Sequence, residues 1–412
     1  MNVRIKAAAV LLLVLAATTP ANAAGKHHDN DWATAWATAP AAAVAGVEQG
    51  YAGYTIRNVV HPTAGGDRAR IHLSNRFGNA PVLLGHVTLA VSAHAGGEAD
   101  PSDGTAAGAV TDVLFGGRTE FTIPAGAEAV SDPVALRVPR DRDLLVSIWT
   151  PQPSGTVTYH PAAMQNSVFS RGPEDHAADP SAAAFTETST AWRYVSAVDV
   201  TGPPGTVVAL GDSITDGVAS TPGADRRWTD YLAARLTHSP VPDYAVANSG
   251  ISGNRVLLDS GYPNYTIYAT SGRSAQWRLP QDVLDRAGVR SVIVFEGVND
   301  IQQAPPQPDP QAIIAGLAQI AAQAHARGLR VVGATIMPFE GWRTWTPGME
   351  AVRVAVNDWI RRSFSAVADF DAVTRDPADP ARIAPAYDSG DHLHPNDAGD
   401  LAMANVVPLN SL

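Results

Sequence analysis

The 412-residue chain contains no cysteine. This absence excludes disulfide bonds, thiol catalysis and zinc sites built on cysteine. Lysine is almost absent too, because Lys6 and Lys26 are the only two. A phosphate-binding loop lysine and a Schiff-base lysine are therefore excluded from the folded region beyond them. Stability has to come from buried apolar side chains, and catalysis from other residue types.

Positive charge and long apolar runs are also scarce. Lys and Arg total 29 against 40 Asp and Glu, a net charge of −11, which argues against nucleic acid as a partner. One apolar run, residues 7–17, follows Arg4 and Lys6 and precedes Ala21-Asn22-Ala23, the pattern of a secretory signal. We therefore expect residues 1–23 to be a signal peptide and the mature protein to be secreted. No other run approaches the ~20 apolar residues of a membrane span, so we expect no stable membrane insertion after cleavage.

Residues 24–200 have the pattern of an all-β domain. Alternation such as Arg70-Ile71-His72-Leu73 is typical of half-buried antiparallel strands. Strands are predicted at 54–60, 69–74, 82–92, 119–123, 144–149, 156–159 and 192–200. With turns of Gly, Pro and Asp between them, these strands predict a jelly-roll-like β-sandwich. Such a domain binds carbohydrate, shapes one wall of a catalytic cleft or is a purely structural partner, and the sequence leaves these roles open.

The pattern changes after residues 201–206, a Gly/Pro cluster that we interpret as a linker. From 207 to 412, apolar strands alternate with helical segments, which predicts a parallel sheet of about five strands between two layers of helices. The predicted strands are 207–210, 244–247, 292–296, 331–336 and 367–370. The predicted helices are 228–236, 276–286, 311–326, 349–362 and one that starts near Asn396.

Ser213 follows the first of these apolar strands. Reacting residues in open α/β sheets lie just beyond the carboxyl ends of the strands, so Ser213 has the place of a nucleophile. Near the other end of the chain, Asp391 precedes His394 by three residues, a spacing at which a turn can bring the carboxylate to the imidazole. Serine, histidine and aspartate are then available for nucleophilic catalysis.

Four sequence blocks extend this pattern. They are Gly211-Asp212-Ser213-Ile214, Asn248-Ser249-Gly250-Ile251-Ser252-Gly253-Asn254, Gly297-Val298-Asn299-Asp300 and Asp391-x-x-His394-Pro395. With these blocks in order over about half of its length, the chain resembles the SGNH (GDSL-type) hydrolases. An α/β-hydrolase would have Gly-x-Ser-x-Gly, but the fifth residue here is Thr215.

The resemblance implies a three-layer SGNH-type fold and a role for each motif residue. Ser213 is the nucleophile, His394 its base and Asp391 the carboxylate that orients the base. The backbone N–H groups of Ser213 and Gly253 and the side chain of Asn299 form the oxyanion hole. From the residues alone, Gly250 is a rival of Gly253, and His392 is a weaker candidate for the base.

Other residues near the blocks have structural interpretations beside functional ones. We expect Asp212 and Asp300 to brace turns. Asn254 and Arg255 either contact a polar substrate or make loop contacts, including a salt bridge from Arg255 to Asp259. Trp342 and Trp345 either line a substrate pocket or pack within their loop, and the loop at 75–78 either contacts substrate or is a plain turn.

These observations predict a secreted serine esterase that hydrolyses carboxylic esters, with short acyl groups favoured because no apolar segment suggests a lid or a lipid-facing patch. Its substrates would be small-molecule or polysaccharide esters. No metal and no cofactor are expected. The alternatives are a polysaccharide O-acetyl esterase and, from a different class, a non-catalytic carbohydrate-binding protein.

Overall fold

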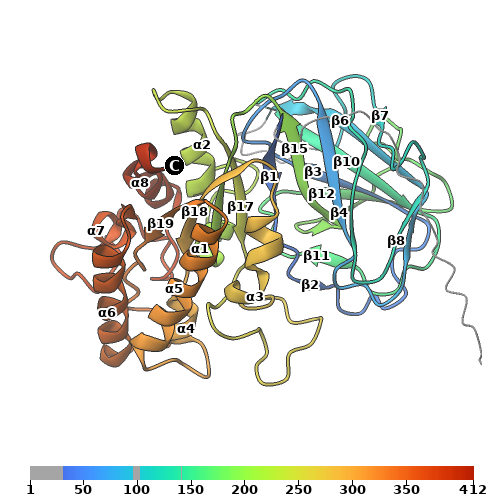
Figure 1. Ribbon diagram of the computed structural model, residues 1–412. Coiled ribbons are helices and arrows are strands. Elements are labelled where there is room, and N and C mark those ends of the chain that lie inside the picture. The colour runs from blue at the N-terminus through green and yellow to red at the C-terminus, as the bar shows by residue number, and fades with distance from the viewer. Residues whose placement is uncertain (1–30, 96–102, 141) are drawn as a thin grey trace, which may run out of the picture.

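The computed structural model describes residues 31–95, 103–140 and 142–412. The predicted signal peptide, residues 1–23, lies outside these ranges. Within them, no helix combines the length and the apolar character needed to cross a membrane. Figure 1 shows a strand-rich half on one side of the molecule and a sheet with its covering helices on the other.

The strand-rich half is built from antiparallel sheets. The larger two run β1-β15-β4-β9 and β13-β12-β3-β10-β6-β7. Their strands are β1 (Trp32–Ala37), β3 (Tyr54–Val60), β4 (Ala69–Ser74), β6 (His86–Ala95), β7 (Thr111–Asp112), β9 (Glu128–Val130), β10 (Arg142–Thr150), β12 (Ser167–Arg171), β13 (Glu187–Ser189) and β15 (Val195–Thr201). Ile71 and Val198 from the smaller of these sheets share one buried core with Ile56 and Val146 from the larger. Two sheets that enclose a common core form a β-sandwich.

Five further short strands form two smaller sheets. They are β2 (Ala42–Ala43), β5 (Val82–Leu84), β8 (Phe121–Ile123), β11 (Thr158–His160) and β14 (Trp192–Arg193). Two of them correct the predicted strands. The predicted strand 82–92 divides at Gly85, where a Cβ would lie 2.6 Å from the Trp149 ring, and β5 pairs with β8 while β6 pairs with β10. The predicted strand 192–200 divides at Tyr194, whose φ of 61° is incompatible with a continuous strand.

The second half contains a five-stranded parallel sheet in the order β17-β16-β18-β19-β20. Its strands are β16 (Thr206–Gly211), β17 (Ala245–Gly250), β18 (Val289–Phe295), β19 (Arg330–Ala334) and β20 (Val367–Ala368). The helices are α1 (Ser213–Asp216), α2 (Trp228–Thr237), α3 (Ala275–Leu279), α4 (Val298–Gln302), α5 (Pro310–Ala326), α6 (Pro347–Ser363), α7 (Phe370–Thr374) and α8 (Asp397–Val406). The predicted fold class, an all-β sandwich before a three-layer α/β domain, is confirmed.

Both faces of the parallel sheet are covered. Val208 and Leu210 of β16 belong to a core with helices α5 and α6, whereas Val207 and Ala209 belong to a core with α2 and α8. Successive side chains of a strand point to opposite faces, which explains why this segment is continuously apolar. The predicted helix 276–286 is instead α3 followed by a π-helical turn, Pro280–Leu284, because Pro280 has no amide hydrogen to continue the α-helical bonding.

The two halves pack closely against each other. Thr34 of β1 donates its N–H to Thr206 Oγ1 over 2.8 Å. Thr63 Oγ1 accepts the Val246 N–H over 2.9 Å and donates to the Val246 carbonyl over 2.8 Å. Such contacts, made by buried backbone groups, fix one half relative to the other. The sandwich therefore packs against the edge of the parallel sheet that β17 forms.

Candidate active site

The first three sequence blocks lie side by side at the carboxyl edge of the parallel sheet. Block one follows β16, block two includes the end of β17, and block three follows β18, the two neighbours of β16. The strand order places a topological switch point between β16 and β18, where open α/β sheets bind their ligands. The switch point thus brings together residues that are far apart in the sequence.

Ser213 begins the short helix α1. The Asp212 side chain caps this helix by accepting the Ile214 N–H over 3.0 Å. Position 211, just before Asp212, has to be glycine, because a Cβ at Gly211 would lie 2.1 Å from Thr215 Oγ1 and 2.9 Å from the Phe295 carbonyl oxygen. The chain therefore turns tightly from strand to helix and presents Ser213 at the edge of the sheet.

Ser213, His394 and Asp391 form a connected hydrogen-bonded row. His394 Nε2 lies 2.8 Å from Ser213 Oγ, and His394 Nδ1 lies 2.6 Å from Asp391 Oδ2. A carboxylate only accepts hydrogen bonds, so the Nδ1–H donates to Asp391 and Nε2 of the neutral ring is free to accept the Ser213 hydroxyl proton. This is the arrangement in which histidine can act as a base towards serine.

Asp391 is held in its ionised form. Its Oδ1 accepts the backbone N–H groups of Leu393 and His394 at 2.9 and 2.8 Å. Burial acts to raise the pKa of Asp391, but the hydrogen bonds from the His394 ring and from these N–H groups outweigh it and keep the pKa well below its ordinary range. The carboxylate therefore stays negative next to the His394 ring.

His392 lies in a different place from His394. Its Nδ1 is 2.6 Å from Asp388 Oδ2, and 47% of its side chain is exposed. Its φ of 68° is in the left-handed region and turns the side chain away from Asp391. The structure therefore brings His394 to Ser213 and leaves His392 at the surface.

Gly253 and Asn299 flank the same edge, and Gly250 has another role. Asn299 is buried, and its Nδ2 has no hydrogen-bond partner among the described residues. Gly253 has a φ of 79°, and a Cβ there would lie 2.4 Å from Ser271 Oγ, so glycine is required. The Gly250 N–H, in contrast, donates to Asn248 Oδ1 over 2.8 Å.

A group of buried acids lies behind the nucleophile. Asp300 accepts the N–H groups of Val256 and Leu257 at 2.7 and 3.1 Å and so ties block three to the loop after block two. Burial raises the pKa of Asp300 to about 6 and that of Asp212 to about 7. Both acids make turn-bracing contacts of the kind expected for them.

Asn254 and Arg255 make internal loop contacts. Asn254 Nδ2 donates to the Ser271 and Arg273 carbonyls, both over 2.8 Å. The expected salt bridge between Arg255 and Asp259 is wrong: Arg255 Nε lies 3.9 Å from Asp300, and Asp259 pairs with Arg273 at 2.7 Å. Arg255 and Asp259 are close in sequence but do not pair, because the loop folds back on block three and brings Arg255 to Asp300.

Other flanking residues divide between the site and the domain interface. The Trp342 ring packs edge-on against His394, with 6.1 Å between ring centroids. In the loop at 75–78, Arg76 pairs with Asp282 of the α/β domain over 2.9 Å. This pair makes that loop part of the interface between the two halves.

Sequence reasoning missed a buried contact from the sandwich to this site. His160 Nε2 lies 2.9 Å from Asp216 Oδ1, and Asp216 Oδ2 accepts the N–H and the hydroxyl of Ser252 at 2.9 and 2.6 Å. Burial acts to lower the pKa of His160, but the Asp216 carboxylate outweighs it and raises that pKa. No sequence signal links His160 to Asp216, because the contact crosses the interface between the halves.

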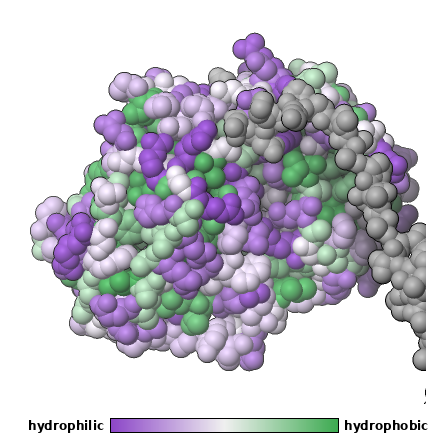
Figure 2. All heavy atoms as spheres, in the orientation of Figure 1, coloured by the Kyte–Doolittle hydropathy of each residue, from purple (hydrophilic) through white to green (hydrophobic). Residues whose placement is uncertain are grey.

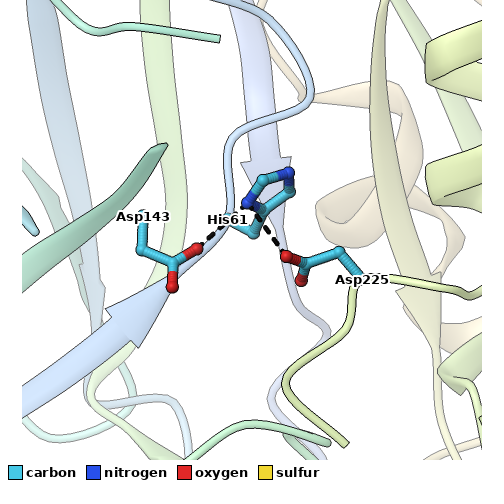
Figure 3. A group of neighbouring side chains, drawn as sticks. All are labelled: His61, Asp143 and Asp225. Carbon is cyan, nitrogen blue, oxygen red and sulfur yellow. Dashed lines mark hydrogen bonds and ion pairs between the residues drawn. The ribbon is translucent and has the colours of Figure 1, made fainter. Parts of the chain in front are cut away.

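One group among the described residues has the composition of a metal site. The ligand atoms of His61, Asp143 and Asp225 lie within 4.8 Å of one another. Figure 3 shows the two carboxylates on opposite sides of the ring, with His61 Nδ1 at 3.0 Å from Asp143 and 3.2 Å from Asp225. A proton and a metal ion compete for that nitrogen. Burial acts to lower the pKa of His61, but the Asp143 hydrogen bond and the charges of Asp225, Asp143 and Asp230 raise it to about 9, which favours the proton.

This ion bridge predicts a pH-dependent contribution to stability. The folded-state pKa of His61, about 9, exceeds the ordinary value of ~6.5. The stabilisation is therefore complete below pH 6.5 and is lost as the pH rises through 9. Urea unfolding of wild type and His61→Asn should differ by on the order of 3 kcal/mol more at pH 6 than at pH 10.

The control for this measurement is His238→Asn at an exposed position. Its difference from wild type is measured at the same two pH values. Because each comparison uses two proteins that share the remaining titrating groups, the ionisations of groups that do not interact with the substituted histidine cancel. A constant difference between wild type and His61→Asn across this range would contradict the ion bridge.

A known protein family matches the part of the chain that contains this site. Residues 209–402 match the model of the GDSL-like Lipase/Acylhydrolase family. No curated protein matches the chain.

Matches to solved structures cover about half of the chain. A lipase/acylhydrolase from Enterococcus faecalis has 18% identity and a TM-score of 0.37, and the match covers 49% of this chain and 92% of that one. An aryl esterase from M. smegmatis has 17% identity and a TM-score of 0.36, covering 48% and 94%. A carbohydrate acetylesterase family member from Sinorhizobium meliloti has 16% identity and a TM-score of 0.37, covering 48% and 93%. Residues 209–402 therefore form a GDSL-like lipase/acylhydrolase domain, and the protein is a carboxylic ester hydrolase.

Proposed function

We propose that this protein is a secreted serine esterase that forms an acyl-enzyme on Ser213. The observation that carries the proposal is the 2.8 Å contact between Ser213 Oγ and His394 Nε2. His394 takes the hydroxyl proton while Oγ bonds to the ester carbonyl carbon, and the protonated ring then gives that proton to the departing alcohol. A water molecule then attacks the acyl carbonyl carbon with His394 as its base, and the protonated ring returns the proton to Ser213 Oγ as the acid is released. Asp391 stabilises the imidazolium without taking its proton.

The oxyanion of the tetrahedral intermediate is bound by the N–H groups of Ser213 and Gly253 and by Asn299 Nδ2. Support for Asn299 is its buried Nδ2, which has no partner among the described residues. Support for Gly253 over Gly250 is that the Gly250 N–H is already bonded to Asn248 Oδ1. Preorganised donors of this kind are worth roughly 3 kcal/mol each in the transition state.

We propose short-chain acyl esters as the substrate class. Efficient attack on lipid aggregates calls for a contiguous apolar patch. The exposed large apolar side chains of the described residues are instead dispersed over separate segments: Val130, Tyr262, Trp277, Val354 and Leu401. Figure 2 shows polar and apolar residues interspersed on the face in view.

The domain assignment and the export of the protein belong to the same proposal. Residues 1–23 are the signal peptide, 24–200 the sandwich, 201–206 the linker and 207–412 the catalytic domain. Only four residues separate β15, which ends at Thr201, from β16, which begins at Thr206. The contacts across the interface join the sandwich to the catalytic half, so activity is best measured on the whole mature chain.

A substrate panel tests this proposal. The mature protein should hydrolyse p-nitrophenyl acetate and butyrate faster than the palmitate ester or a phospholipid, with rates compared as kcat/KM. Fastest turnover of palmitate or phospholipid would refute the short-chain assignment. Turnover of acetylated xylan well above that of p-nitrophenyl acetate would replace it with polysaccharide deacetylation.

A further inference from the structure

The side chain of Asn299 has to face the oxyanion with the correct end. An asparagine amide carries an NH₂ group on one side and an oxygen on the other, and only NH₂ donates hydrogen bonds. A rotation by 180° would direct Oδ1 at the oxyanion and repel it. Catalysis through Asn299 therefore requires that its neighbours fix the direction of the amide.

The first neighbour that fixes it is Gln303. Its Nε2 donates to the Gly253 carbonyl over 3.2 Å and to Asn299 Oδ1 over 2.8 Å. A backbone carbonyl can only accept, so the Gln303 NH₂ group is the end that faces Gly253. The same NH₂ group then requires an acceptor at Asn299, which is Oδ1. The Gly253 carbonyl thus determines which way the Asn299 amide points.

The second neighbour is Gln302, whose own amide is oriented by a tryptophan. Gln302 Oε1 accepts Trp342 Nε1–H over 3.1 Å and the Thr344 hydroxyl over 3.0 Å. An indole N–H can only donate, so the oxygen end of Gln302 faces Trp342. Its Nε2 is then directed at Asn299 Oδ1, 2.9 Å away. The Gly253 carbonyl and the Trp342 indole N–H therefore independently fix the same orientation of the Asn299 amide.

We propose that Gln302 and Gln303 are positioning residues that hold the Asn299 NH₂ group towards the oxyanion. This proposal rests on the oxyanion role of Asn299 in the proposed function.

The test is a double-mutant cycle with Gln303→Glu and Asn299→Ala. The glutamate has the same shape, but it places an acceptor next to the Gly253 carbonyl and Asn299 Oδ1, which favours rotation of the asparagine amide. We expect kcat for p-nitrophenyl acetate to fall about 10²-fold with little change in KM, and Asn299→Ala to lower kcat about 10²–10³-fold. Adding Gln303→Glu to Asn299→Ala should cost less than about threefold more, because the amide it misdirects is gone.

Two further variants keep the test decisive. Gln311→Glu adds the same charge at an exposed position in the first turn of α5 and should leave kcat unchanged. Gln303→Met removes the donor without adding charge, and it should lower kcat by about three- to tenfold. It replaces Gln303→Glu in the cycle if that variant does not fold, as judged by its thermal unfolding.

The outcomes separate the two proposals. If Asn299→Ala leaves kcat unchanged, the oxyanion role fails, and the positioning proposal fails with it. If Asn299→Ala lowers kcat but the Gln303 variants do not, only the positioning proposal is overturned. A full additional loss from a Gln303 variant in the Asn299→Ala background would overturn it as well, since the glutamine would then act independently of the amide.

Discussion

Replacing Ser213 with alanine is expected to reduce kcat for p-nitrophenyl acetate on the order of 10⁴–10⁶-fold. The substitution removes the oxygen that attacks the ester, and no other described side chain approaches His394 Nε2 as Ser213 Oγ does, at 2.8 Å. The oxyanion donors remain, so a small residual rate above that of water is expected. Steady-state kinetics of wild type and Ser213→Ala, purified in parallel, measure the loss.

A second measurement identifies the attacking atom directly. A fluorophosphonate ester should add one phosphonyl group to wild type, located on Ser213 by mass spectrometry, and none to Ser213→Ala. Ser239→Ala, beyond the C-terminal end of α2, is the matched control and should be fully active and labelled. Retention of more than about a hundredth of the activity by Ser213→Ala would disprove the acyl-enzyme mechanism.

The regular elements of the fold were predictable wherever burial alone sets the sequence pattern. The strands 54–60 and 69–74 were predicted with the bounds of β3 and β4. In the α/β half, β16 is buried on both faces, and this double burial is visible in the sequence as a continuous apolar run. The alternation of strands and helices was enough to predict the layers of this half and the order in which the blocks follow its strands.

Local backbone geometry was not predictable in the same way. Gly85 and Tyr194 interrupt segments that have the apolar pattern of one strand, because a ring contact or a positive φ overrides that pattern. The helices α1, α4 and α7 have only four or five residues. A segment that short cannot display a helical period, and two of these helices carry site residues.

The candidate site residues were predicted from the motifs that carry the resemblance. Residues that act through a neighbour had no such signal. Gln302 and Gln303 follow block three after one intervening residue, yet their function depends on contacts with Trp342 and Gly253, which only the fold brings near. Arg255 shows the converse error, since its expected partner was close in sequence and its actual neighbour, Asp300, is close in space.

The two histidines of the last block provide the second large effect. Replacing His394 with alanine should reduce kcat on the order of 10⁴-fold or more, because Ser213 then has no base within hydrogen-bond reach. His392→Ala should reduce it by less than about tenfold, since that side chain binds Asp388 and is 47% exposed. Kinetics on p-nitrophenyl acetate at one pH compare the two variants directly.

The two substitutions delete the same group from one loop. Both leave a carboxylate without its ring partner: Asp391 in one case and Asp388 in the other. Because the His394 side chain is 9% exposed and that of His392 47%, thermal unfolding of each variant is needed to separate loss of activity from destabilisation of the loop. The large loss should be confined to His394→Ala because only this ring reaches Ser213 Oγ. If His392→Ala is the more damaging change, His392 is the base, and the loop has to rearrange to bring it to the serine.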